Sequence, residues 1–105
     1  MEISKADWKL FREKIGTWQE KYMERLNEEY VELLTSNKPA SVKFWDLDKR
    51  IKLDKRRPGV QLELRKSDVP LDIVALIRDG AITMADLDGF SEDLRDTVAH
   101  FVENY

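Results

Sequence analysis

The chain has 105 residues, of which 42% are hydrophobic and 37% charged, and its formal net charge is −3. This length supports one domain with a modest core, and the apolar content is too high for a disordered chain. Because the sequence contains no cysteine, it excludes disulfides, cysteine-ligated zinc, iron–sulfur clusters and a thiol nucleophile.

A long amphipathic helix is predicted for the first third of the chain. Ser4 is suited to cap it, with Asp7 three residues later in a capping-box arrangement and Ile3 outside as a hydrophobic staple. Pro39 predicts that the helix ends between residues 35 and 38. Eight apolar residues fall within a stripe about 120° wide on this helix: Trp8, Phe11, Ile15, Trp18, Tyr22, Leu26, Tyr30 and Leu33.

A second, charged helix is predicted from about Ala40 to Arg56, where Pro58-Gly59 stops it. The segment Val60 to Lys66 is ambiguous, since its alternating apolar residues favour a strand while its residue types favour helix. No other segment offers a partner strand, so we favour a short helical or extended link there. The apolar residues of the second helix are Phe44, Leu47 and Ile51 on one face, with Trp45 beside them.

The last third of the chain predicts a compact helical hairpin. A helix over Val69 to Arg78 is apolar on most sides and should lie at the centre of the core. Gly80 can then adopt a positive φ after the helix end. Thr83 with Asp86 forms a second capping box, and a final helix begins at Ser91 and keeps apolar residues at helical spacing to the C-terminus. Its apolar residues are Leu94, Val98, Phe101 and Tyr105.

The predicted fold is therefore all-α: one domain over residues 1–105, with a long N-terminal helix, a second charged helix, and a C-terminal helical hairpin packed on the aromatic face of the long helix. The N-terminal residues lack a signal-peptide pattern, and no apolar run approaches about 18 residues. We expect a cytoplasmic protein that does not associate with membranes.

Charge is segregated along the chain. Residues 1–39 have a net charge of −1, residues 40–66 of +5, and residues 67–105 of −7. Six basic side chains cluster in the middle block, and they are candidates for contact with nucleic acid or another polyanion, for a protein partner, or for internal pairing with the acidic tail from Asp86 to Asp96. These six are Lys49, Arg50, Lys52, Lys55, Arg56 and Arg57.

Two patterns suggest calcium or acid–base chemistry, and each has a simpler structural interpretation. Asp79 to Asp86 resembles the second half of an EF-hand loop, but Ala75 and Ile77 occupy positions 1 and 3, where calcium needs side-chain oxygens. A helix end followed by a turn explains this segment better. His100 is the only histidine and has no evident nucleophile as a partner, so we interpret it as a surface or interface residue.

A dense set of acids could suggest a divalent metal site. Helix capping and the favourable position of negative charge at helix N-termini explain most of these residues instead. We therefore predict no catalytic, cofactor-binding or metal-binding residue, and no enzymatic activity. The acids are Asp86, Asp88, Glu92, Asp93 and Asp96.

The aromatic stripe of the long helix is interpreted as core-facing, with a ligand groove as the alternative. A 30-residue helix is about 45 Å long, whereas a compact domain of this size spans about 34 Å. One end must overhang, so we expect a homodimer that covers the excess, with an elongated monomer as the alternative. The residues assigned to self-association are Trp8, Phe11, Trp18, Tyr22 and Tyr30.

Three segments carry a resemblance to known sequences: DWKLFREKIGTWQEKYMERLNEEYVELL, KFWDLDKRIKLDKRRPGV and IVALIRDGAITMADLDGFSEDL. Together they resemble a group of small uncharacterised helical proteins of Firmicutes, some of which carry transporter labels. The resemblance implies a bacterial or mobile-element origin and transfers no activity, cofactor or binding residue.

These observations lead to one functional hypothesis and one alternative. We expect a non-enzymatic protein-interaction or adaptor module without a cofactor. The alternative is a small nucleic-acid-binding accessory or regulatory protein that uses residues 49–57. Salt dependence separates the two, because contacts to phosphate weaken steeply with salt.

Overall fold

The computed structural model describes all 105 residues and contains only helices, turns and extended segments. This confirms the all-α prediction. The segment from Val60 to Lys66 is a turn and an extended link that ends where a short 3-10 turn begins, and it pairs with no strand. The elements are α1 Lys5–Leu34, α2 Ala40–Asp54, η1 Lys66–Asp68, α3 Val69–Arg78, η2 Met84–Leu87 and α4 Glu92–Asn104.

The start of α1 is capped by Ser4, whose hydroxyl oxygen accepts a hydrogen bond from the Asp7 backbone N–H at 3.1 Å. The predicted capping box is only half formed, because the Asp7 carboxylate turns to a distant residue. It accepts from the Ser91 backbone N–H at 2.9 Å and from the Ser91 hydroxyl at 2.5 Å. Ser91 itself caps α4, so Asp7 joins the N-termini of the first and last helices.

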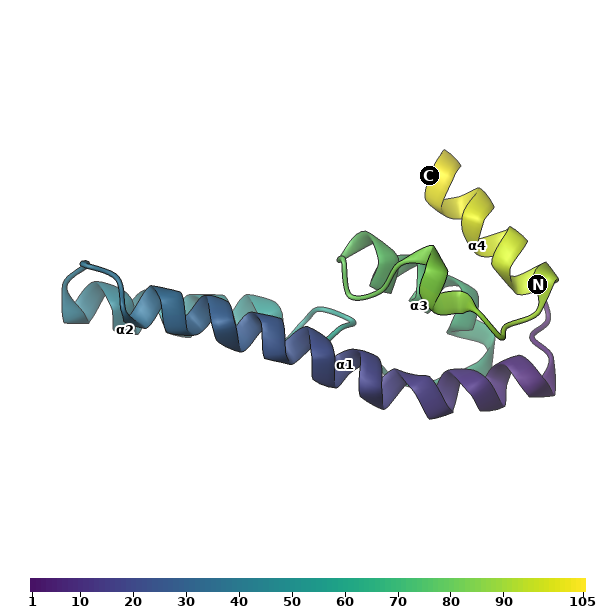
Figure 1. The fold of residues 1–105 in the computed structure, drawn as a ribbon, viewed down its shortest axis with the longest axis horizontal. Helices are drawn as coiled ribbons and strands as arrows, with labels where there is room; N and C mark the ends of the chain where they lie inside the picture. Colours follow the sequence, from purple (N-terminus) through teal and green to yellow (C-terminus); the bar gives the residue numbers. More distant parts are fainter.

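The hydrophobic core lies where α3, η2 and α4 cover the N-terminal half of α1 (Figure 1). This confirms that the C-terminal hairpin packs on the aromatic face of the long helix. One residue departs from the prediction that α3 is apolar and covered on most sides: Leu71 is 60% exposed. The 13 core residues are Ile3, Phe11, Ile15, Trp18, Val69, Ile73, Val74, Leu76, Ile82, Leu87, Phe90, Leu94 and Val98.

Gly80 and Gly59 lie where a side chain would be strained, as does Gly89, which has φ +92°. Gly80 has φ +75°, as its position after α3 predicts, and lets the chain turn toward η2. Gly59 lies flat against Tyr22, since a Cβ added there would approach the Tyr22 ring to 2.4 Å. The Gln19 side chain donates to the Pro58 carbonyl at 3.0 Å, so the turn after α2 is fastened to α1.

The molecule is elongated, with principal extents of 51 × 27 × 20 Å and a Cα radius of gyration of 16.4 Å. A compact chain of this length would have a radius of gyration of about 13 Å. Figure 1 shows the cause: the C-terminal half of α1 runs beyond the other helices, accompanied only by α2. We call residues 23–54 the arm and the remaining helical body the head. The predicted overhang of the long helix is therefore present as a two-helix arm.

Candidate interaction surface

The arm has no hydrophobic core of its own. Leu26 is the last buried residue of α1, and the only buried residue of α2 is Asp54. A helix stabilised by tertiary packing normally buries an apolar stripe against a neighbour. The large apolar side chains left exposed on the arm are Val31, Leu34, Val42, Phe44, Trp45 and Leu53.

A polar network joins the two helices of the arm at its base. The Asp54 carboxylate, in a residue only 3% exposed, accepts from the Tyr30 hydroxyl at 2.5 Å and from Arg57 Nε at 3.1 Å. Arg50 lies 3.7 Å away on the other side of the same carboxylate. Burial and the bond to Asp54 raise the pKa of Tyr30 to about 12. Since a buried carboxylate is stable only with such partners, this network fixes α2 against α1.

On the side of the arm that faces the head, the two helices form a charged groove of about 600 Å³. Arg25 donates to the Gly80 carbonyl at 2.5 Å, and Arg57 reaches Asp79 at 3.7 Å. Burial raises the pKa of Tyr22 at the inner end of this groove, although the neighbouring Arg57 opposes the shift. Charges of both signs line the groove and contact one another, so its observed role is to tie the arm to the head.

The opposite side of the arm is largely apolar, and we call it the free face. On α1 it contains Met23, Asn27, Tyr30 and Leu34, which follow one another at intervals of four, three and four residues. This spacing keeps all four within about 60° of one another on the helix. On α2 the same spacing places Phe44, Asp48 and Ile51 in a matching row, which Lys55 continues at the C-cap of the helix.

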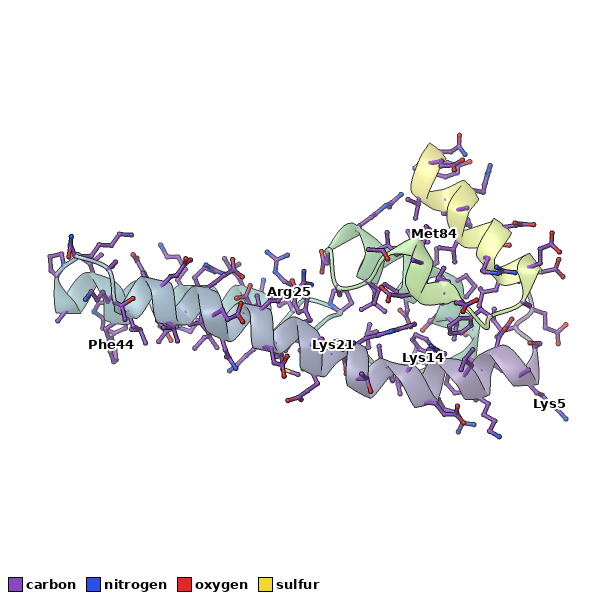
Figure 2. The ribbon with its side chains drawn as sticks, viewed as in Figure 1. Lys5, Lys14, Lys21, Arg25, Phe44 and Met84 are labelled. Atoms are coloured by element: carbon purple, nitrogen blue, oxygen red, sulfur yellow. The ribbon has the colours of Figure 1, made fainter.

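Between these two rows lies a groove of about 230 Å³ near the base of the arm. Phe44 is 64% exposed at the distal end of the free face. Figure 2 shows Phe44 on the side of the arm away from the head, and Arg25 on the side toward it. The free face is therefore unobstructed by the rest of the chain. The groove is lined by Met23, Leu26, Asn27, Tyr30, Ile51, Asp54, Lys55 and Val60.

The basic segment 49–57 is divided by the structure into paired and unpaired side chains. Arg50 contacts Glu29 at 3.6 Å as well as Asp54, and Lys52 contacts Asp48 at 2.9 Å. Arg57 contacts Asp54 and Asp79. Lys49, Lys55 and Arg56 are exposed and form no ion pair. None of the six pairs with the acidic tail from Asp86 to Asp96, so internal pairing occurs with nearer acids.

The aromatic residues assigned to self-association lie mostly inside the monomer. Phe11, Trp18 and Tyr22 are buried, the first two in the core of the head and the third against Gly59. Trp8 and Tyr30 are half-buried, and Tyr30 is held by Asp54. The head covers Phe11 and Trp18, and the turn after α2 covers Tyr22, so these three side chains are not accessible to a second copy. Tyr30 lies on the arm, beyond the part of α1 that the head covers.

The remaining candidates are at the surface of the head. His100 is exposed on α4, with Nδ1 3.2 Å from the Asn104 side-chain amide. The Asp86 carboxylate accepts from the Thr83 backbone N–H at 2.7 Å, which is the predicted cap. No group of three or more His, Cys, Asp or Glu side chains lies close enough together to hold a metal ion. Asp79 to Asp86 forms the end of α3, a turn and η2.

Sequence reasoning missed two features of the structure. The exposure of Phe44 and Trp45, whose rings meet edge to face at 5.0 Å, follows from the absence of any third helix over the arm. The only signal in the sequence was two large aromatics beside a charged stretch. The second feature is Asp72, whose Oδ2 is buried without a partner. Burial, together with nearby Asp68, raises the pKa of Asp72 to about 6.

Comparisons with protein-family models, with curated proteins and with solved structures find no match to this chain. No helix combines the length and the apolar character needed to cross a membrane.

Proposed function

We propose that this chain is a non-enzymatic protein-interaction module that binds its partner through the arm. The observation that carries the proposal is the exposed apolar surface of the arm, where Phe44 and Trp45 are each 64% exposed. Exposed apolar surface of this kind marks an interaction site more often than a solvated face. Aromatic side chains are also the residues most often responsible for binding energy at protein interfaces.

The architecture favours the same proposal. The head contains the whole hydrophobic core, so the arm is not needed to complete it. The arm is nevertheless fixed in position by Asp54, Tyr30 and Arg57. A surface held rigid before binding loses less conformational entropy when the complex forms.

The test compares partner capture by the wild type with capture by a Phe44→Ser, Trp45→Ser double variant, using host lysate and quantitative mass spectrometry. Leu71→Ser is the matched control, because Leu71 is 60% exposed on the head. We expect partners that the arm variant loses and the control keeps. Equal capture by all three proteins would contradict the proposal.

A second candidate function is nucleic-acid binding by α2. Trp45, Lys49 and Lys52 follow one another at intervals of four and three residues, so they share one face of α2. Arg56 follows in the turn just after the helix. Basic side chains beside an exposed aromatic ring suit single-stranded nucleic acid. A mobility-shift series at 50 and 200 mM salt tests this candidate, and a Lys49→Gln, Arg56→Gln variant should lose any shift. Absence of a shift at 50 mM salt with micromolar protein would eliminate it.

A further inference from the structure

We propose that the partner of the free face is a second copy of this chain, and that two arms pack antiparallel about a two-fold axis near Ile51 to form a four-helix bundle. This inference rests on the proposed function and names the partner of the same surface. A two-helix hairpin buries apolar side chains on both of its helices when it pairs with another hairpin.

The spacing on the free face is that of a helix-bundle seam. Both rows repeat at intervals of four, three and four residues, which is the spacing of core positions in bundles of antiparallel helices. The α1 row carries no charged side chain, and the α2 row carries only Asp48 and Lys55. A face with so few charges suits a buried seam better than a solvated surface.

The two charges are arranged so that the face is complementary to itself. In a two-fold pairing, residues whose numbers add to the same total face each other. An axis between residues 51 and 52 places Asp48 opposite Lys55 of the second copy and brings the two Ile51 side chains together. The reverse pair forms by symmetry, so the dimer contains two such pairs, and each Asp48 also contacts Lys52 of its own chain at 2.9 Å.

The same register also gives a contact to Phe44, which is 64% exposed on the free face. With this axis, Phe44 lies at the level of the turn that follows α2 in the second copy, because α2 ends at Asp54. The groove of about 230 Å³ is at this end of the arm, and Lys55 and Val60 line it. Phe44 of each copy can therefore enter the groove of the other. The head lies on the opposite side of the arm and does not obstruct this approach (Figure 2).

The area available to such a dimer is small. The α2 row extends about 15 Å from Phe44 to Asp54, and two helices side by side are about 20 Å wide. Two such faces present about 600 Å² in outline, which is the size of a small interface. By contrast, the α2 face with Lys49, Lys52 and Arg56 would place like charges opposite each other, so it does not suit self-pairing.

The first test is sedimentation velocity of the purified chain at 50 µM, with a dimer of twice 12.4 kDa as the expected species. Phe44→Glu should weaken dimerisation more than about tenfold, while the head variant Leu71→Glu should leave it unchanged. A monomeric wild type, or a Phe44→Glu variant as dimeric as the wild type, would overturn the proposal.

The second test examines the register through charge exchange. Asp48→Lys alone and Lys55→Asp alone each place like charges opposite each other, so each variant should be monomeric. Mixed in equal amounts they should form a heterodimer, detected by native mass spectrometry, because every Lys then faces an Asp. Homodimers of either variant that match the wild type in stability, or a mixture that stays monomeric, would overturn the antiparallel register.

These outcomes separate this inference from the proposed function. If the wild type is monomeric and the arm variant still loses a partner from lysate, the arm binds a different protein and only the present inference fails. If the wild type is dimeric through the free face and no lysate partner depends on the arm, the self-pairing stands without a further partner. If the wild type is monomeric and no lysate partner depends on the arm, both proposals fail.

Discussion

Removal of the Asp54 carboxylate should loosen the base of the arm more than removal of any surface acid. We consider Asp54→Ala. The Tyr30 hydroxyl at 2.5 Å donates to a charged acceptor, and such a hydrogen bond contributes about 1.5–3 kcal/mol. The Arg57 and Arg50 side chains are 45% and 39% exposed, so each returns to water at a cost of only about 0–1 kcal/mol.

Relief of carboxylate desolvation offsets part of this loss. The net decrease in unfolding free energy should therefore be about 2–3 kcal/mol. With an m-value of about 1.5 kcal/mol per molar urea, the midpoint of unfolding should fall by about 1.3–2 M. The measurement is urea unfolding followed by circular dichroism, with all proteins at one concentration because self-association would change apparent stability.

A matched control is Asp46→Ala on the same helix. Asp46 is 40% exposed and contacts Lys38 at 3.5 Å, so its loss should cost less than about 1 kcal/mol. A double-mutant cycle of Asp54→Ala with Tyr30→Phe should give a coupling energy of about 1–2 kcal/mol. If Asp54→Ala costs no more than Asp46→Ala, or if the cycle is additive, the network does not fix the arm as described.

Three further predictions concern the head and its junction with the arm. Asp72→Asn should raise stability by about 1 kcal/mol at pH 7.5, after discounting for partial exposure. The pKa of Asp72 in the folded state is raised to about 6 from 3.8, so the wild type loses stability as pH rises through 6. The advantage of Asp72→Asn over the wild type in thermal unfolding should therefore become smaller toward pH 4.5. Gly59→Ala should lower the free energy of unfolding by about 1–3 kcal/mol through its clash with Tyr22. Gly16→Ala meets no atom within 4 Å and should raise the free energy of unfolding by about 0.5–1 kcal/mol. Equal effects of the two variants in chemical unfolding would refute the close packing of Gly59 on Tyr22. Asp7→Ala should cost about 1.5–3 kcal/mol and couple with Ser91→Ala in a double-mutant cycle, and additive effects would argue against the link between α1 and α4.

The head could be predicted from the sequence because its signals are local. The cap at Ser4, the turn at Gly80 and the spacing of the α1 stripe each depend on neighbours a few residues away. The covered part of that stripe could not be predicted. The same periodicity continues from Trp8 to Leu33, yet only Phe11 to Leu26 is buried, since the C-terminal hairpin is too short to reach farther.

The candidate surface was only partly visible in the sequence for a related reason. The pair Asp48–Lys52 has the spacing of neighbours on a helix and can be recognised from the sequence alone. The contacts from Arg50 to Glu29 and from Arg57 to Asp79 join residues 21 and 22 positions apart, and they depend on how the arm folds back. The Asp7–Ser91 bond spans 84 positions and leaves no local pattern.

Since α1 continues without interruption from the head into the arm, its residue count contributes to the distance and the angle between them, together with the contacts of Arg25 with Gly80 and of Arg57 with Asp79. Each residue added to α1 at the junction would lengthen the arm by about 1.5 Å and rotate the free face by about 100° about the helix axis. An insertion of one residue would thus change the direction in which Phe44 points relative to the head. An insertion of seven residues would nearly restore that direction and would place Phe44 farther from the head. A change in the length of this helix therefore alters the direction of the free face as well as the reach of the arm.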